Sequence, residues 1–235
     1  MTNITQQSLG LSKPPIAIGF LDAEPQGISQ WAEGPVPAGC SFWRAAMDGK
    51  SFYTVPSNHY NCAVGSYTHA ISIPADRGNV LQDTIGFMVG NGYLEMAEVP
   101  GIPVLPKTPA FIAYAPVAGA AFTPDVVVIA ARPASAMLIY EAALRAGADD
   151  ALTPSLGRPA CAVLPLAQNS GKAALSFGCK GNRTFTGLPD DELYIAIPGA
   201  KWDAVAGALE SIAGANAAME AHYRAHEAAI AAQPQ

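Results

Sequence analysis

Cysteines are the residues of this sequence whose chemistry best suits a metal or cofactor site. Cys40, Cys62 and Cys179 each stand beside small residues, in GCS, NCAVG and GCKG. Thiolates bind soft metals and iron–sulfur clusters, and small neighbours let a cofactor approach the backbone closely. We therefore predict these three as ligands. The alternative is that all four cysteines are buried small hydrophobes, and Cys161 in ACAVLPL fits that alternative best.

His59 precedes Cys62 by three residues in HYNC, a spacing that lets both side chains reach one ion. It is a candidate fourth ligand, although a histidine that hydrogen-bonds the backbone at a helix entry explains it equally well. His69 follows Cys62 by two helical turns and is predicted to contact a substrate. If Cys62 opens a helix, the field of the N-terminus lowers the pKa of its thiol. Cys62 would then be a nucleophile, with Cys40 as resolving thiol.

Two basic segments are candidate substrate sites. Lys180 and Arg183 lie in GCKGNRTFTG, after a predicted strand, where backbone N–H groups and two cations would bind an anion. The spacing is not that of a P-loop, and a hairpin turn with exposed charges is the alternative. Arg132 in AARPAS lies at the C-terminal end of a predicted strand, a usual ligand position in open α/β sheets, or it caps the structure there. The predicted substrate is a small anionic molecule.

Composition narrows the class of protein. Half of the residues are hydrophobic and 14% are charged, which is typical of a compact globular chain. The net charge of −6 and the lack of a basic stripe argue against nucleic-acid binding. The N-terminus lacks signal-peptide features and no apolar run spans a bilayer, so we expect a cytoplasmic protein that does not bind membranes. In that reducing compartment the cysteines are more often ligands, redox thiols or core residues than disulfides.

The order of predicted elements indicates an α/β or α+β fold, with two closely packed α/β halves around mixed sheets. The chain is predicted to be one domain, 1–235, with sub-halves 1–100 and 108–235 separated by the turn-rich VPGIPVLPKTP. Apolar runs predict strands at 14–21, 52–55, 110–117, 125–131, 173–179 and 192–197. Helical periodicity predicts helices at 41–49, within 78–94, at 135–145, and over the C-terminal segment with a break at Gly214.

The sequence resembles the uncharacterised ArCR-like proteins of bacteria and archaea. The likeness runs from about Pro14 to about Ile212 and rests on the segments PIAIGFL, CSFWR, NHYNCAVGSYTH, PDVVVIAARP, SFGCKGNR and DDELYIAIPG. The resemblance implies a cytoplasmic α/β protein and brings no established activity with it. It also implies that Cys40, Cys62 and Cys179 are motif cysteines, whereas Cys161 lies outside the motifs and His59 looks like a feature of a subgroup.

Three hypotheses about function follow. In the first, three cysteines bind an iron–sulfur cluster or a single soft metal ion, with Lewis-acid or redox chemistry on a small anion. In the second, the chain is a metal-free thiol enzyme with Cys62 as nucleophile. In the third, it is a carrier of haem or another small molecule, with His59 or Cys62 as axial ligand. The sequence does not decide whether the chain is an enzyme.

Overall fold

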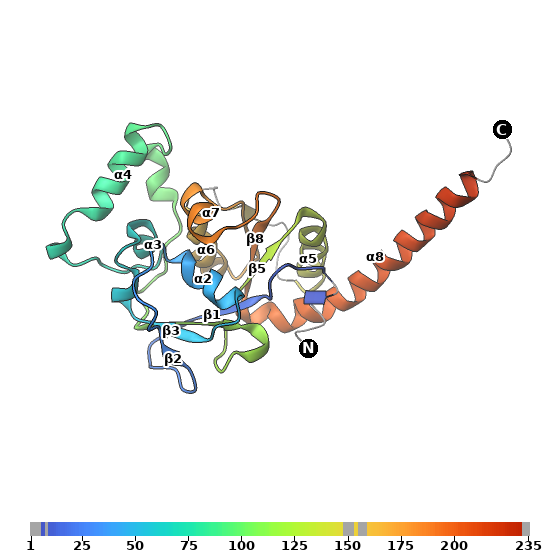
Figure 1. The fold of residues 1–235 in the computed structure, drawn as a ribbon, viewed down its shortest axis with the longest axis horizontal. Coiled ribbons are helices and arrows are strands. Elements are labelled where there is room, and N and C mark those ends of the chain that lie inside the picture. The colour runs from blue at the N-terminus through green and yellow to red at the C-terminus, as the bar shows by residue number, and fades with distance from the viewer. Residues whose placement is uncertain (1–5, 8, 148–152, 155–158, 232–235) are drawn as a thin grey trace.

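A computed structural model describes residues 6–7, 9–147, 153–154 and 159–231 (Figure 1). These residues form one mixed sheet with the strand order β2-β3-β4-β1-β5-β8-β7-β6. The pairs β2–β3 and β6–β7 are parallel and the others antiparallel. The strands are β1 (Ile16–Leu21), β2 (Ser29–Gln30), β3 (Phe52–Thr54), β4 (Phe111–Pro116), β5 (Val126–Ala131), β6 (Thr153–Pro154), β7 (Ala174–Ser176) and β8 (Leu193–Pro198). The predicted α/β class is confirmed.

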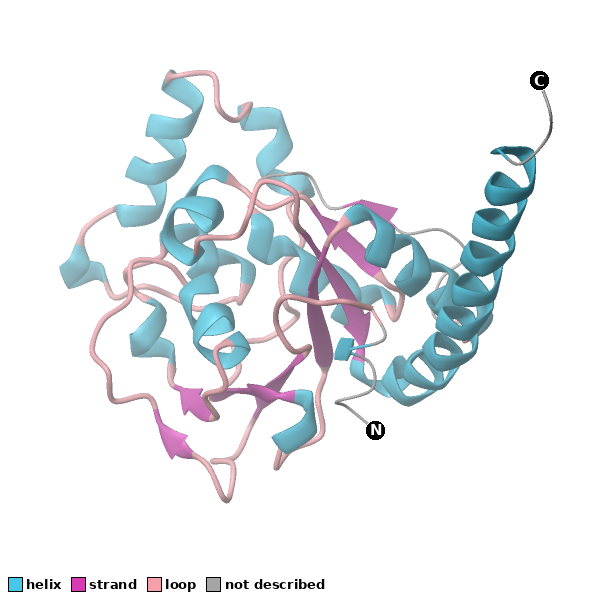
Figure 2. Ribbon diagram, turned by 45° about the vertical axis from the view of Figure 1, so that its right-hand side comes forward, coloured by secondary structure: helices cyan, strands magenta, loops and turns pink. Residues whose placement is uncertain are grey.

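Helices cover both faces of the sheet (Figure 2). The α-helices are α2 (Cys40–Met47), α3 (Ala63–Thr68), α4 (Val80–Gly90), α5 (Pro133–Arg145), α6 (Val163–Ser170), α7 (Lys180–Thr186) and α8 (Trp202–Ala231). The 3-10 turns are η1 (Pro56–His59), η2 (Ala75–Arg77), η3 (Met96–Gly101), η4 (Val117–Gly119), η5 (Ala160–Ala162) and η6 (Gly199–Lys201). In the described part of the chain, no helix is both long enough and apolar enough to cross a membrane.

Strand β5 shows why the apolar runs predicted strands well. Its six residues are all buried, and they alternate between two cores. Val126 and Val128 face one core, whereas Val127 and Ile129 face the other. A strand that is covered on both faces reads as a continuous apolar run because neither side chain series meets water. Strand β1 lies between β4 and β5, so the sheet joins segments of both predicted halves.

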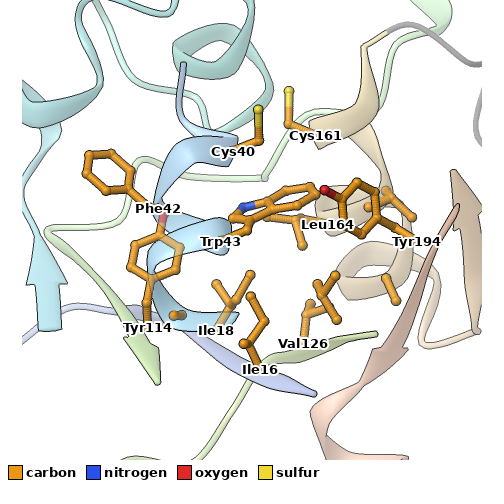
Figure 3. Close-up of a cluster of buried hydrophobic side chains, with 14 of the residues drawn as sticks. Ile16, Ile18, Cys40, Phe42, Trp43, Tyr114, Val126, Cys161, Leu164 and Tyr194 are labelled. Carbon is orange, nitrogen blue, oxygen red and sulfur yellow. The ribbon is translucent and has the colours of Figure 1, made fainter. Parts of the chain in front are cut away.

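The two faces of the sheet have different covers. One core contains α2 and α6, and there Trp43 packs at a right angle on Tyr194 with the rings 5.3 Å apart, next to Leu164 (Figure 3). The other core contains α5 and α8, with Ile139 and Val205 fully buried. We call these the cysteine face and the α5–α8 face.

Two local predictions need correction. The predicted break at Gly214 is wrong, because α8 runs unbroken from Trp202 to Ala231. A glycine costs a helix interior about 1 kcal/mol relative to alanine, which long flanking helical segments offset. The hairpin turn considered for the basic segment does not form, because Lys180 begins α7. Helix α4 is confirmed, but none of its residues is buried in a core.

Candidate functional site

The four cysteines come from four segments and line one cavity of about 430 Å³ on the cysteine face. Cys40 is the first residue of α2 and Cys161 is in η5. Their sulfurs leave the packed core on the same side, above Trp43 and Tyr194 (Figure 3). Cys62 and Cys179 precede α3 and α7 as N-cap residues. Each cysteine therefore stands at the start of a short helical segment, where the chain turns toward the cavity.

Gly65 leaves the room that the Cys62 sulfur occupies. A Cβ atom at Gly65 would lie 2.7 Å from Cys62 Sγ, closer than real Cβ contacts. Gly65 is inside α3, where glycine weakens a helix, so the close approach of the sulfur explains why glycine stands there. The backbone N–H groups of Gly39 and Gly65 lie near this sulfur and favour its thiolate.

Each of the other three sulfurs also has a polar neighbour. Cys179 Sγ accepts a hydrogen bond from the backbone N–H of Asn182 at 3.4 Å. The Asn182 side chain is close enough to Cys40 to favour its thiolate. Thr68 Oγ1 lies 3.3 Å from Cys161 Sγ. Donors near sulfur stabilise thiolate charge, and they tune the potential of a cluster where one is bound.

Burial nevertheless favours the protonated thiol at Cys40, Cys62 and Cys161. It raises the pKa of the Cys40 thiol to about 12 and raises the pKa values of Cys62 and Cys161. The other cysteines add to these shifts, because a negative charge on one thiol opposes ionisation of its neighbours. The four sulfurs are therefore close enough to interact electrostatically. Among the described residues, however, no three His, Cys, Asp or Glu side chains are placed to hold a single metal ion.

Helix α4 and the segment after it form the apolar wall of the cavity. The wall is lined by Val80, Leu81, Ile85, Met88, Leu94 and Ile102, and Phe185 of α7 closes it from another side. Helix α4 projects from the rest of the molecule (Figure 1), and Phe87 is 75% exposed although it also borders the cavity. The predicted amphipathic pattern of α4 thus faces a cavity rather than the core.

The two predicted histidines are buried and do not line the cavity. His59 is 1% and His69 2% exposed, and their rings stack 5.8 Å apart. His59 Nε2 is 2.8 Å from Thr54 Oγ1, and His69 Nδ1 donates to Gly65 O at 2.7 Å. Burial lowers the pKa of His59 to about 3 and that of His69 to about 4. Both rings are thus neutral at neutral pH and belong to the scaffold that carries Cys62 and Gly65.

Of the predicted cations, Lys180 lines the cavity, whereas Arg183 and Arg132 do not. The Arg183 guanidinium donates to three backbone carbonyls, Pro189 O, Phe177 O and Glu192 O, at 2.6 to 2.9 Å. Arg132 is the N-cap residue of α5, and its Nε is 2.9 Å from a carboxylate oxygen of Asp191. Neither arginine thus faces the cysteines.

The chain matches one family model, DUF169, described as Uncharacterised ArCR, over residues 5–208. The chain belongs to this family. None of the curated proteins compared with it matches. No solved structure matches either. The match spans all four cysteines, and family membership leaves the activity open.

Sequence reasoning missed Cys161 as a cavity residue. Its apolar surroundings are typical of a core position, and it is indeed 8% exposed. The signal that could have found it is local: Pro159 precedes it and a helix follows, so it also stands at a helix start. Non-local packing of η5 against α3 then brings it to the other three cysteines.

Proposed function

We propose that the cysteine cavity binds an iron–sulfur cluster and that the chain uses it for redox or Lewis-acid chemistry on a small molecule. The observation that carries the proposal is the convergence of all four thiols of the chain on one cavity. Cys40 and Cys62 lie 22 residues apart in the first predicted half of the chain, whereas Cys161 and Cys179 belong to the second half. Buried free thiols have no packing reason to gather in this way.

A cluster suits this arrangement better than a single ion. The ligands of a single zinc or iron ion must come within about 2.3 Å of one point, whereas cluster ligands bind different irons and stand farther apart. The described residues offer no group placed around one ion. The polar hydrogens near each sulfur would stabilise the thiolates that a cluster requires, and the apolar wall would shield it from water.

The other two hypotheses have less support. The metal-free thiol enzyme needs a lowered pKa at Cys62, but burial raises the pKa of this thiol more than the nearby N–H groups lower it. The haem carrier needs an axial ligand that faces a cavity, and the His59 ring is buried against Thr54 and Phe42 instead. Cys62 lines the cavity, so it is the remaining axial candidate.

The cavity walls favour a mainly apolar substrate with one anionic group. Aliphatic and aromatic side chains make up most of the lining, and Lys180 is the cation among the described residues there. An acid of this kind would place its tail against α4 and its carboxylate near Lys180. Because Arg183 is bound to backbone carbonyls, it does not share this role.

The test of the cluster is anaerobic purification followed by iron and sulfide analysis, visible absorption and electron paramagnetic resonance. We expect about four irons per chain for a [4Fe–4S] cluster. The variants Cys40→Ser, Cys62→Ser and Cys179→Ser should lose most of the iron, and Arg132→Gln, outside the cavity, should keep it. Loss of the cluster in Cys161→Ser would indicate four cysteine ligands, and retention would indicate three ligands and an open iron.

Two further results bear on the proposal. Gly65→Ala should reduce iron binding because it displaces the Cys62 sulfur, although every cysteine is kept. Thermal unfolding of each variant separates cluster loss from misfolding. Iron-free protein after anaerobic purification and after reconstitution with iron and sulfide would overturn the cluster.

The substrate class has its own test. An aromatic carboxylic acid and its neutral amide are titrated against the protein by calorimetry. The wild-type protein should bind the acid with roughly tenfold higher affinity than the amide, because one charge-assisted hydrogen bond contributes about that much. Lys180→Gln should remove the preference and Lys107→Gln, which pairs with Asp22 away from the cavity, should retain it. Equal binding of both compounds to wild type would contradict the anionic group.

A further inference from the structure

The C-terminal half of α8 stands away from the body of the protein (Figures 1 and 2). The buried residues of α8 end at Ile212, and residues 217–231 are all exposed. This segment is about the length at which an isolated helix in water is marginal, and in proteins most helical stability comes from packing an apolar face. The segment has no such packing within the described chain.

An apolar seam continues from the core into this segment. Leu209 and Ile212 pack in the α5–α8 core. Their face continues at alternating steps of four and three residues through Asn216, Met219, Tyr223, His226 and Ile230. This is the a/d spacing of a heptad repeat, in which every such residue faces a partner helix. Met219, Tyr223 and Ile230 are 47%, 63% and 53% exposed.

A shallow groove runs along the same seam. It begins at Leu138 of α5, beside Ala213, and extends to Ile230 near the end of the helix. Helix α5 occupies the seam of α8 up to Ile212, so a second helix can enter only beyond that point. A partner helix that ends against Leu138 would fit this limit without displacing α5.

We propose that residues 213–231 form an antiparallel two-helix pair with the same segment of a second copy of this chain. The seam is self-complementary in this orientation. With Met219 of one copy opposite Tyr223 of the other, Asn216 faces His226, polar against polar. The same register brings Ile230 to the end of the open seam, beside Leu138 of the other copy. A sulfur–aromatic contact and an apolar contact thus meet in layers that repeat by two-fold symmetry.

Charges on the flank are compatible with this pairing. Arg224 lies 3.7 Å from Glu220 and 3.5 Å from Glu227 in its own helix. In the antiparallel pair the two-fold axis passes at residue 221, and the Glu220 side chains on either side of it each keep the Arg224 of their own helix as partner. A parallel pair would instead require each copy to occupy the position of the other's α5. The groove at Leu138 therefore favours a second copy in the antiparallel sense.

The size of the contact sets its strength. Two segments of this length bury on the order of 1,000 Å² in total, at the lower limit of stable protein interfaces. We therefore expect a dimer that dissociates on dilution.

Sedimentation equilibrium over a range of protein concentrations tests the pairing. Wild type should pass from monomer to dimer, and Tyr223→Glu and Met219→Glu should raise the dissociation constant roughly 100-fold by placing a carboxylate in the seam. Ala221→Glu, on the opposite side of the helix, is the matched control and should dimerise like wild type. The substituted residues are exposed, so at concentrations where every protein is monomeric the unfolding temperature should be the same in all variants. A wild type that stays monomeric, or equal loss in Ala221→Glu, would overturn the proposal.

Disulfide trapping tests the orientation. Asn216→Cys and His226→Cys proteins are oxidised separately and as a mixture, with wild type as a control for its own cysteines. The antiparallel pair predicts a crosslinked dimer in the mixture, joining one variant to the other, and little in either protein alone. Crosslinks within each protein alone would show a parallel pair and would overturn the antiparallel arrangement.

Discussion

The cysteine face and the α5–α8 face are built on the same sheet by different rules. Helices α5 and α8 are long, and the core that they cover consists of apolar residues. The helices of the cysteine face are shorter, and buried polar groups such as Thr54, His59 and Thr68 lie among them. Long apolar helices stabilise the sheet, whereas short helices give many chain starts from which side chains can be aimed.

Buried polar atoms that lack a hydrogen-bond partner also distinguish the two faces. Five side-chain atoms of the described residues are buried without a hydrogen-bond partner, and all are on the cysteine face: Ser41 Oγ, His59 Nδ1, His69 Nε2, Tyr114 Oη and Asn182 Oδ1. An unsatisfied buried polar atom costs about 1–3 kcal/mol. These atoms should therefore reduce the stability that the apolar core of the cysteine face contributes.

Acidification should produce the largest difference between the faces. Burial lowers the pKa values of His59 and His69 to about 3 and about 4, against about 6.5 in the unfolded chain. Their neutral burial is compatible with full stability above pH 6.5, and stability falls as the unfolded chain takes up protons below it. Both together predict a loss of about 5 kcal/mol between pH 6.5 and 4.5.

Urea unfolding at several pH values measures this loss. The double variant His222→Gln and His226→Gln is the control, because both side chains are exposed on α8, and it should follow the wild-type profile at low protein concentration. A free energy of unfolding that is constant from pH 7 to pH 4.5 would show that the two buried histidines are not neutral in the fold.

Truncation of a side chain in the α5–α8 core should lower the free energy of unfolding by nearly as much. Ile139→Ala removes a fully buried side chain from α5 and should lower the free energy of unfolding by about 2–5 kcal/mol. Met137→Ala, on the same helix but 49% exposed, should change it by less than about 1 kcal/mol. Chemical denaturation measures both, and equal effects would remove the distinction between the core and the surface of α5.

On the cysteine face, removal of a buried polar group should raise the free energy of unfolding rather than lower it. Ser41→Ala removes a buried hydroxyl that has no partner among the described residues, so it should stabilise the fold by up to about 1 kcal/mol. Ser170→Ala provides the contrast, since its hydroxyl donates to Leu166 O at 2.7 Å and its loss should be neutral or destabilising. A destabilised Ser41→Ala protein would mean that the hydroxyl is satisfied in solution.

The smallest expected effect lies in α8. Gly214→Ala should stabilise the helix by about 0.5–1 kcal/mol because alanine has the higher helix propensity. A Cβ at Gly214 meets no atom within 4 Å, so no clash opposes the gain. Circular dichroism should show slightly more helix at a given temperature. A loss of helix would restore the break that the sequence predicts at this glycine.

The sequence predicts local structure well where one local cause decides it. The apolar run at 125–131 and Pro133 at the start of the next helix are found as expected in β5 and α5. The predicted cysteines 40, 62 and 179 do lie around one cavity. Their role as ligands stays a prediction.

The parts that sequence reasoning missed depend on packing in three dimensions, in part between distant segments and in part between neighbouring turns. Cys161 reads as a core residue, and only the packing of η5 against α3 brings it to the cavity. The sequence favours Arg183 as an anion binder because it does not reveal the three backbone carbonyls, on both sides of α7, to which the guanidinium donates. The burial of His59 follows from its place between Thr54 and Phe42, which the HYNC spacing does not reveal.

The place of β1 in the sheet also sets the order of assembly during synthesis. Ile16 pairs with Pro116, so a further 100 residues must be made before β1 can pair with β4 along its full length. At translation rates of 5–20 residues per second, that wait is roughly 5–20 s. Cys40 and Cys62 leave the ribosome within this interval, and Cys179 follows later. The nascent chain therefore presents reactive thiols before any cavity exists to shelter them, and the cysteine site can form only after most of the chain has been made.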